Sequence, residues 1–421
     1  MLLPLVIFIV LVLILDLYTY KGLKLTFRKP QDKSTIVLLN SIFWAIPLLL
    51  ILSVVFMLYL RPAEPDPCIF NLNFYIIGFT LVFYLPKLLF SLFHLIEDIV
   101  FLVRDLSQHV ITFLKKDPNG EFTKRRSGMN YLSRTGILLS FIPFVAILHG
   151  VFIGRFDFQV INKHIEFKSL PASFDGFRIV HISDFHIGSF CRYTNRVEKA
   201  VKIINKQKPD MIVITGDIVN NFTAELYEFT DILSELYAPY GVYSILGNHD
   251  YGDYFQWESN EAKEKNLDDM LVVQEEMGFR LLLNEWDSVV INGEKIAVIG
   301  VENWGLPPFP QYGDLAKAME GAENVPFRIL LSHDPTHWDA EVLGRTSIEL
   351  TLSGHTHGMQ VGIENSFLKW SPSKFKYPRW GGLYREEEQY LYVNRGLGFV
   401  AFPGRIGMPP EITVIELRSG S

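Results

Sequence analysis

The hydrophobic and polar positions of this chain follow two different patterns that meet near residue 155. Before that point, four long apolar runs are separated by short polar loops. After it, short runs rich in Val and Ile alternate with polar stretches of helical spacing. An apolar run of roughly 20 residues is long enough for a helix to cross a lipid bilayer. The first pattern therefore predicts an all-α transmembrane region, and the second predicts an α/β or α+β globular domain.

The four apolar runs are predicted to be membrane-spanning helices. They cover residues 2–20, 36–60, 69 to about 92, and 135–154. Asp16 interrupts the first run, which lacks the basic start and the cleavage site of a secretory signal, so we expect it to span. The third run contains Pro86 and Lys87 and continues as an amphipathic stretch, which we expect at the membrane interface. A buried helical domain is the alternative, but such runs are rare in soluble cores.

The charges of the loops predict the side of the membrane on which the second region lies. The first and third loops are rich in Lys and Arg, whereas the second offers Arg61 beside Glu64 and Asp66. The basic residues of the first and third loops are Lys21, Lys24, Arg28, Lys29, Lys33, Arg104, Lys115, Lys116, Lys124, Arg125, Arg126 and Arg134. Because basic loops stay in the cytoplasm, we expect everything after residue 154 on the outer side of a multi-pass protein.

Composition limits the class of protein and its partners in three ways. The chain has 421 residues, of which 49% are hydrophobic, and this excess is concentrated in the first 155 residues. The net charge of −7 provides no basic field, so no nucleic acid binding is expected. Cys68 and Cys191 are the only cysteines and define no disulfide framework. We expect them to be free thiols, with a single bridge between them as the alternative outside the cell. The oligomeric state stays open.

Side chains that bind metals follow five predicted strands of the second region. These strands cover residues 178–183, 211–215, 242–246, 328–331 and 349–353. Further strands are expected at 158–167, 280–283, 289–291, 295–301, 389–394 and 411–417, and helices at 195–207, 224–236 and 267–277. Strand C-terminal ends converge on one edge of a sheet, where open α/β sheets keep their sites. Five separate elements thus direct donors toward one crevice.

The donors are carboxylates, imidazoles and one amide. They are Asp184, His186, Asp217, Asn248, His333, His355 and His357. Such a set matches the needs of two divalent metal ions about 3.5 to 4 Å apart. Mixed oxygen and nitrogen donors suit Mn²⁺, Fe or Zn²⁺ better than Ca²⁺. The sequence therefore predicts a dinuclear metal centre whose metal identity stays open.

The order of these motifs resembles the calcineurin-like metallophosphoesterase superfamily. Asp-x-His, Gly-Asp, Gly-Asn-His-Asp, a later His and Gly-His-x-His appear in that order between about residues 177 and 417. Gly-His-Thr-His-Gly at 354–358 and the tail at 392–398 and 409–412 are similar to its membrane-anchored or exported branch. Met359 departs from the second glycine of many members. The resemblance implies a four-layer β-sandwich flanked by helices. From the change of pattern near residue 155, we expect this domain at 156–421, after a membrane domain at 1–155.

The resemblance also implies a role for each donor. Asp184, His186 and His357 would hold the first metal, while Asn248, His333 and His355 would hold the second. Asp217 would bridge both ions.

Three further residues are candidates beside these predicted ligands. His249 has no metal assigned to it, so we expect it to be the catalytic proton donor or charge stabiliser at the leaving oxygen. Asp250 would orient that imidazole or cap the following turn, and we favour the cap. Arg395 would contact the phosphate or support the ligands through its bidentate fork.

These features predict a membrane-anchored phosphohydrolase. It would cleave a phosphomonoester or diester, including a lipid-linked one, by in-line attack of a hydroxide that bridges the two metals. One alternative is a hydrolase of a nucleotide-linked lipid-sugar pyrophosphate at the cytoplasmic face. Another is a non-catalytic membrane protein with a structural metal site. The unassigned His249 favours catalysis, and the spans are expected to lack the buried charge clusters of a transporter.

For four other residues the sequence allows either a structural or a functional role. His181 lies within the first strand that leads to predicted ligands and is expected to be a core residue. Trp257, Trp304 and Phe309 lie in long polar loops, where they would form either a pocket rim or ordinary loop packing.

Overall fold

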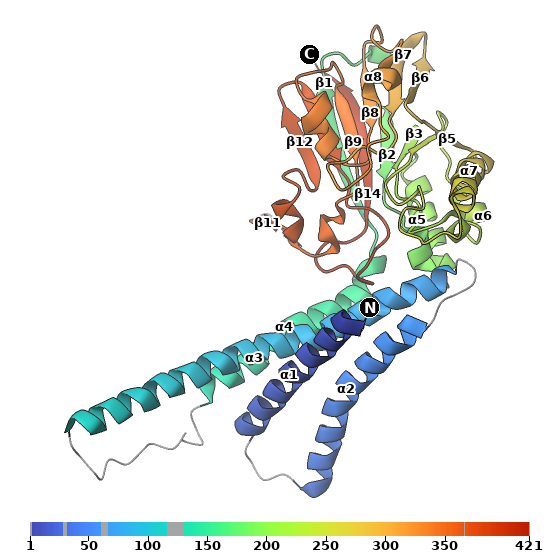
Figure 1. Ribbon diagram of the computed structural model, residues 1–421. Coiled ribbons are helices and arrows are strands. Elements are labelled where there is room, and N and C mark those ends of the chain that lie inside the picture. Colours follow the sequence, from blue (N-terminus) through green and yellow to red (C-terminus); the bar gives the residue numbers. More distant parts are fainter. Residues whose placement is uncertain (1, 28–31, 60–65, 116–129, 366, 421) are drawn as a thin grey trace. The chain divides into compact units, whose positions relative to one another are not determined.

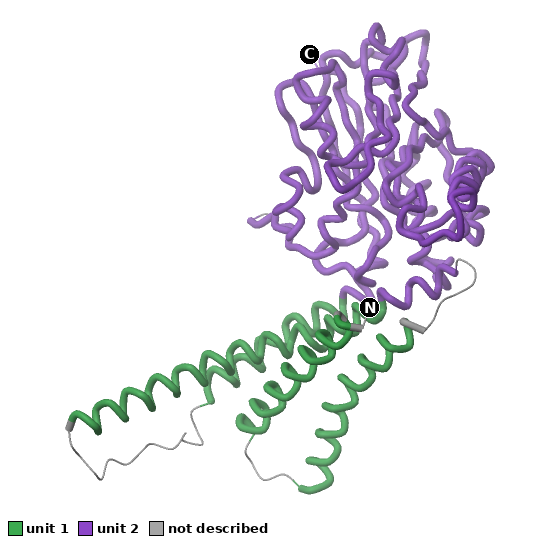
Figure 2. Tube along the Cα trace, viewed as in Figure 1, with its two compact units in different colours: residues 1–61, 75–149 green, residues 62–74, 150–421 purple. Residues whose placement is uncertain are grey.

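The structure, a computed structural model, describes residues 2–27, 32–59, 66–115, 130–365 and 367–420 (Figure 1). The chain forms two compact units, coloured separately in Figure 2. The first comprises residues 1–61 and 75–149, and the second comprises 62–74 and 150–421. Several charged loop positions used to predict the orientation, at 28, 29, 61, 64, 116 and 124–126, lie outside the described residues.

The membrane region consists of long apolar helices, as predicted. They are α1 (Leu2–Thr26), α2 (Lys33–Tyr59), α3 (Pro67–Lys115) and α4 (Tyr131–Phe152). All four are long and apolar enough to cross a membrane. α3 continues through Pro86 and on through the amphipathic stretch after residue 92, for 49 residues in total. The carbonyl of Pro86 accepts a hydrogen bond from Ser140 Oγ at 2.9 Å, in keeping with the way neighbouring helices satisfy backbone groups at membrane prolines.

The first unit contains a buried ion pair, so the expectation that the spans lack buried charge clusters is wrong. Asp16 on α1 is fully buried, and its Oδ1 lies 2.5 Å from Lys87 Nζ on α3. Tyr84 donates a hydrogen bond to the other carboxylate oxygen at 2.8 Å. Deeper along α3, the buried His94 lies 2.8 Å from the hydroxyl of Ser133. Partners that lie 71 residues apart in sequence leave no local pattern, which is why the pairing was not foreseen.

Two six-stranded sheets form the centre of the second unit (Figure 1). In spatial order, the first sheet contains β1 (Gln159–Phe167), β14 (Glu411–Ser419), β2 (Arg178–Ile182), β3 (Met211–Thr215), β4 (Val242–Ile245) and β5 (Phe279–Leu281). The second contains β12 (Gly382–Glu386), β13 (Gln389–Val393), β9 (Leu350–Ser353), β8 (Arg328–Leu331), β7 (Glu294–Gly300) and β6 (Glu285–Ile291). β2 to β5 are parallel, and so are β13, β9, β8 and β7.

Helices cover the outer faces of both sheets, which confirms the predicted four-layer sandwich. Alternate residues of β2, such as Ile179 and Val180, face the core between the sheets and the core under the helices respectively. The first sheet packs against α5 (Thr194–Lys206) and α7 (Asn260–Glu276). The second sheet packs against α8 (Leu315–Met319) and the turn η5 (Trp338–Val342). The central strands β3, β4, β8 and β9 are therefore buried on both faces and are continuous apolar runs in the sequence.

Local differences from the expected elements lie mostly in loops. The helix expected at 224–236 is reduced to η4 (Thr223–Glu225) and α6 (Thr230–Leu233), and α7 begins at Asn260, where the Ser259 side chain caps it. β12 and the small hairpin of β10 (Ile363–Glu364) and β11 (Lys369–Trp370) were not expected. The remaining short turns are η1 (Gly154–Phe156), η2 (Ala172–Phe174), η3 (Ile187–Phe190), η6 (His357–Gln360) and η7 (Pro372–Phe375).

Both cysteines lie in the second unit and form a disulfide, so the expectation of free thiols is wrong. Cys68 is in the first turn of α3, and Cys191 follows η3. Their Cα atoms are 5.6 Å apart, a usual separation for bridged cysteines. Two cysteines that are 123 residues apart give no spacing signal from which this pairing could have been predicted. The bridge ties the first turns of α3, up to Phe74, to the sandwich unit.

Candidate metal centre

The seven predicted ligands follow the C-terminal ends of five strands from both sheets. β2 leads to Asp184 and His186, β3 to Asp217, and β4 to Asn248. From the second sheet, β8 leads to His333, and β9 leads to His355 and His357. Every one of these side chains except His355 is buried. The two sheets thus meet at a single edge with all of the predicted donors.

The backbone at this edge is held in an unusual conformation. Asp184, His186, Asp217, His355 and His357 all have positive φ angles, between 42° and 68°. Left-handed backbone costs a residue with a side chain about 1–2 kcal/mol.

Two glycines of the motifs are required by the close approach of neighbouring segments. A Cβ at Gly216 would lie 2.4 Å from the backbone nitrogen of Gly247. One at Gly354 would lie 1.9 Å from Ser183 Oγ. Strain and crowding of this kind are typical of functional sites.

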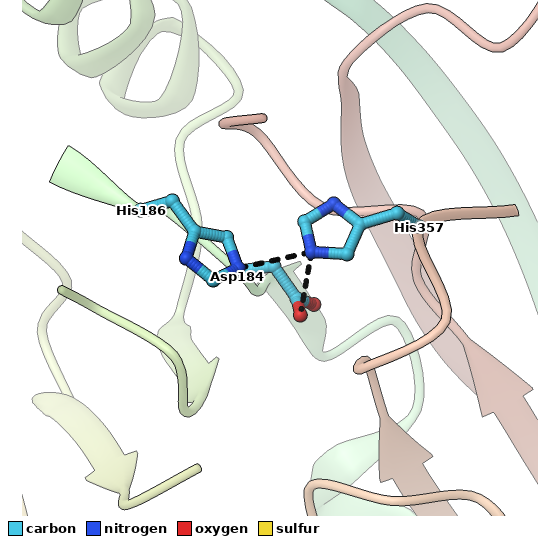
Figure 3. Close-up of side chains that lie close together, drawn as sticks. All are labelled: Asp184, His186 and His357. Atoms are coloured by element: carbon cyan, nitrogen blue, oxygen red, sulfur yellow. Dashed lines mark hydrogen bonds and ion pairs between the residues drawn. The ribbon is translucent and has the colours of Figure 1, made fainter. Parts of the chain in front are cut away.

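The first donor group brings together Asp184, His186 and His357 (Figure 3). The Nε2 atoms of the two imidazoles are 3.0 Å apart, and His357 Nε2 lies 3.3 Å from Asp184 Oδ1. Both Asp184 oxygens also accept the backbone N–H of His355 at 3.0 Å. The ligand atoms of all three side chains lie within 4.8 Å of one another, which is compact enough to surround one metal ion.

The second donor group surrounds His333. Its Nε2 lies 3.2 Å from Asn248 Oδ1, from His355 Nδ1 and from Asp217 Oδ2. The same oxygen of Asp217 lies 3.6 Å from Nε2 of His186 in the first group. The Asp217 carboxylate therefore lies between the two donor groups, where a bridging ligand is required.

Hydrogen bonds from outside the donor groups fix the orientation of the donors. His333 Nδ1 donates to the carbonyl of Thr215 at 2.7 Å, which leaves Nε2 for the crevice. The Asn248 amide nitrogen donates to Tyr254 Oη at 2.8 Å, so its oxygen faces His333. On the far side, His355 Nε2 lies 2.8 Å from the hydroxyl of Tyr377.

Asp250 acts within the loops and not toward the crevice. It is fully buried, and its oxygens accept backbone N–H groups of Asp217, Ile218 and Gly247 at 2.8 Å each. A fourth N–H, from Val219, lies at 3.1 Å. Asp250 thereby has a structural role, but it holds the loop that carries Asp217 and does not cap the turn that follows it, as the sequence favoured.

The electrostatics of the crevice favour bound positive charge. Burial raises the pKa of Asp184 and Asp217, but neighbouring His357 and His333 respectively lower both below their usual range. Burial lowers the pKa of His355 to about 4. Burial also lowers the pKa of His333, but the charge of Asp217 outweighs this and raises it to about 10. Ionised carboxylates are the form that divalent ions bind, whereas His333 would give up its proton to an incoming ion, so this donor set fits a metal centre whose loading releases a proton.

His249 faces the same crevice from the loop after β4. Its Nδ1 donates to the carbonyl of Asn220 at 2.6 Å, and its backbone N–H donates to Asp217 Oδ1 at 2.9 Å. The imidazole stacks on the Tyr254 ring, with centroids 4.3 Å apart. A ring nitrogen lies within 4.8 Å of the ligand atoms of His186 and Asp217. With Nδ1 engaged, Nε2 is the nitrogen that can meet a substrate.

Two arginines lie behind the first donor group. Arg395 forms ion pairs through Nε with Glu411 and through Nη1 with Glu364, so it is held within the fold. Arg405 was not singled out from the sequence, although its Nη2 lies 3.2 Å from His357 Nδ1. Burial lowers the pKa of Arg405 to about 9. Its position in a Gly- and Pro-rich loop carries no sequence signal for this contact.

The structure assigns a role to each of the four residues for which the sequence allowed either a structural or a functional role. His181 is a buried core residue, as expected, with Nε2 2.9 Å from Thr215 Oγ1. Phe309 lies edge-on to His355, with centroids 4.8 Å apart, and so borders the candidate site. Trp304 stacks on His337, and Trp257 donates to the carbonyl of Gly252, so both belong to loop packing.

Comparisons with known proteins agree with this geometry. Residues 2–155 match a family described as "Probable Calcineurin-like phosphoesterase, transmembrane domain", and residues 177–359 match "Calcineurin-like phosphoesterase". The chain is 34% identical to the Bacillus subtilis metallophosphoesterase YkuE, over 62% of this chain and 86% of that one. It is 28% identical to a Danio rerio transmembrane protein with a metallophosphoesterase domain, over 68% and 63% of the respective chains.

Among solved structures, a dimetal phosphatase from Danio rerio is similar at 11% identity and a TM-score of 0.31, covering 53% of this chain and 88% of that one. The family matches and the Bacillus relative carry the assignment. The protein is a membrane protein and a metal-dependent phosphoesterase, and its family binds divalent metal ions. The chain belongs to the calcineurin-like metallophosphoesterase family.

Proposed function

We propose that this enzyme cleaves its phosphoester by attack of water on phosphorus in line with the leaving oxygen, at a centre of two divalent ions. The observation that carries the proposal is the position of Asp217, whose Oδ2 lies 3.6 Å from His186 and 3.2 Å from His333. Asp184, His186 and His357 would hold one ion, and Asn248, His333 and His355 the other. Mn²⁺, Fe and Zn²⁺ all suit this donor set.

When bound, the ions supply a water nucleophile of lowered pKa and withdraw charge from the phosphate oxygens. His249 donates a proton to the leaving oxygen through Nε2, because the carbonyl of Asn220 holds Nδ1 at 2.6 Å. The stacked ring of Tyr254 keeps the imidazole from rotating. Asp250 holds the loop of Asp217 and so keeps the carboxylate between the donor groups.

The substrate class that we propose is a phosphomonoester or diester at a membrane, including a lipid-linked one. Tyr254 and Phe309 are aromatic neighbours of His249 and His355, so the site has apolar surface for a leaving group. The loop after His357 also exposes apolar side chains that would suit a lipid surface. These are Met359, Ile363, Phe367, Leu368 and Phe375, exposed by 48%, 50%, 97%, 48% and 79%.

We propose that the four helices form a multi-pass anchor and that the catalytic unit faces away from the cytoplasm. The basic first and third loops support this orientation. The disulfide between Cys68 and Cys191 gives independent support, because such bonds persist in oxidising compartments. A reporter fused after Ser421 tests the proposal, and a signal from the cytoplasm contradicts it.

Turnover by the detergent-purified protein tests the chemistry. The assay supplies Mn²⁺ and compares p-nitrophenyl phosphate, bis-p-nitrophenyl phosphate and membrane lipid phosphates. Asp217→Ala is expected to lose both turnover and bound metal. His249→Ala is expected to lose turnover by about 10²- to 10⁴-fold on esters with poor leaving groups and to keep its metal. Unchanged turnover of such esters in His249→Ala contradicts the proton-donor role.

A further inference from the structure

The first turns of α3 contact the loops that carry the candidate site, and all of these contacts lie within the second unit. Cys68 is bonded to Cys191 at the end of η3. Asn71, which is 4% exposed, donates a hydrogen bond through Nδ2 to the carbonyl of Gly188 in η3. Phe70 packs edge-on against Phe222, with ring centroids 5.7 Å apart. One short helical segment therefore contacts two separate loops.

Hydrogen bonds join these two loops to each other next to His249. The Asn220 side chain donates to Ser189 Oγ of η3 at 2.9 Å, and the Asn220 carbonyl holds His249 Nδ1. Buried Glu225 accepts the backbone N–H of Asn220 at 2.5 Å. A Cβ on Gly188 would lie 2.4 Å from the same carboxylate, which shows how closely η3 packs here. η3 and Asn220 are therefore linked through the Ser189 hydroxyl and packed against the same Glu225 carboxylate.

A second set of contacts reaches the aromatic ring that stacks on the same imidazole. Phe70 and Phe222 both pack against Phe255, with centroids 5.5 and 5.3 Å away. Phe255 follows Tyr254, whose ring stacks on His249. The start of α3 therefore supports both the carbonyl and the aromatic ring that fix the orientation of His249.

We infer that Cys68, Phe70 and Asn71 are positioning residues for His249, a role that rests on its proposed function as proton donor. A disulfide alone would stabilise the fold without favouring one step of the reaction. Here the bridge, the Asn71 amide and the Phe70 ring converge on the segments that orient a single imidazole. Because a misplacement of about 1 Å can reduce a catalysed rate by about 10²-fold, small changes at these residues would reach the chemical step.

Esters that differ only in their leaving group separate positioning from general stability. Phenolate needs a proton when it departs, whereas 4-nitrophenolate is stable without one, so only phenyl esters depend strongly on His249. Asn71→Ala, Phe70→Ala and the double variant Cys68→Ser/Cys191→Ser are expected to lose kcat on phenyl phosphate by about tenfold. We expect less than about a twofold loss on 4-nitrophenyl phosphate and unchanged bound metal. Asn73→Ala, an exposed asparagine of the same helical turn, is the matched control.

A measurement that is independent of turnover keeps the inference separate from the proposed function. Hydrogen exchange at 218–223 and 248–255 is expected to rise in Asn71→Ala and to stay unchanged in Asn73→Ala. Equal losses on both esters, or unchanged exchange, overturn the positioning role even if the wild type is active. A wild type that turns over neither the phosphate esters nor the corresponding diesters overturns the proposed function, while exchange still decides whether α3 orders these loops.

Discussion

The candidate metal centre and the Asp16–Lys87 pair of the membrane unit are two buried charge clusters that are built differently. In the membrane unit, one carboxylate faces one ammonium group at 2.5 Å, and Tyr84 satisfies the other oxygen. In the crevice, carboxylates and imidazoles converge from five strand ends, and five of these residues have left-handed backbone. Opposite charges that satisfy each other indicate a structural pair, whereas donors that crowd together at strained positions indicate a site for a cation.

The largest effect is expected when the charge between the two donor groups of the crevice is removed. Asp217→Asn retains the size of the side chain but removes the charge between the two donor groups. Since metal ions supply several kcal/mol of transition-state stabilisation, kcat should fall by at least about 10³-fold. Steady-state kinetics with metal analysis measures this loss, and Asp268→Asn on the exposed surface of α7 is the control. Full activity in Asp217→Asn would rule out a bridging carboxylate.

The next largest effect is expected when one partner of the Asp16–Lys87 pair is removed. Lys87→Met leaves Asp16 buried without its ammonium partner and should lower the free energy of unfolding by about 3–5 kcal/mol. The double variant Asp16→Leu/Lys87→Met removes both charges and should recover most of that stability. Thermal unfolding in detergent measures both changes. If the double variant is no more stable than the single one, the pair has a role beyond mutual compensation.

A smaller effect is expected at His355, at the edge of the crevice. Tyr377→Phe removes the hydroxyl 2.8 Å from His355 Nε2 and leaves the aromatic packing in place. Outer hydrogen bonds of this kind are worth about 10- to 100-fold in metal affinity. Metal titration of the purified protein gives the affinity of each ion, and we expect the affinity of only one of the two to change. Identical titration curves for variant and wild type would separate His355 from the metal centre.

The smallest effect concerns Tyr254, which contacts two candidate residues in different ways. Tyr254→Phe removes the acceptor for the Asn248 amide at 2.8 Å but retains the ring that stacks on His249. The cost should be about 1 kcal/mol, a typical value for one hydrogen bond. Kinetics should assign it to metal binding, with kcat at saturating metal unchanged. Tyr254→Leu, which removes the ring as well, should reduce kcat at every metal concentration.

The pattern of apolar residues along the sequence was sufficient to predict the strands that lead to the candidate site. β3 and β8 match the predicted ranges at both ends, because strands buried on both faces are continuous runs of apolar residues. The donors converge because each follows such a strand, so their approach to one another could also be predicted. The fold class followed from the same motifs through the family resemblance.

Long-range pairing could not be predicted, and it accounts for most of what was missed. The contact between Arg405 and His357 depends on a loop that folds back behind the site. The ion pair of Arg395 with Glu411 and the bridge between Cys68 and Cys191 join residues whose neighbours in sequence give no hint of a partner. No residue of the edge strand β12 is fully buried, so no alternation of apolar and polar residues marks it in the sequence. In each case, the information lies in the tertiary structure and not in a window of the chain.

The disulfide has a consequence for biogenesis. Cys68 and Cys191 can be joined only in one compartment, so the chain between them must cross the bilayer an even number of times. That interval contains nearly all of α3 and the whole of α4. If α3 and α4 both span, as proposed, the bond forms during synthesis only after both helices have been inserted and residue 191 has reached the side of Cys68. A chain in which only one of the two helices inserted could not close the bridge, so the bond would distinguish that error from the proposed topology.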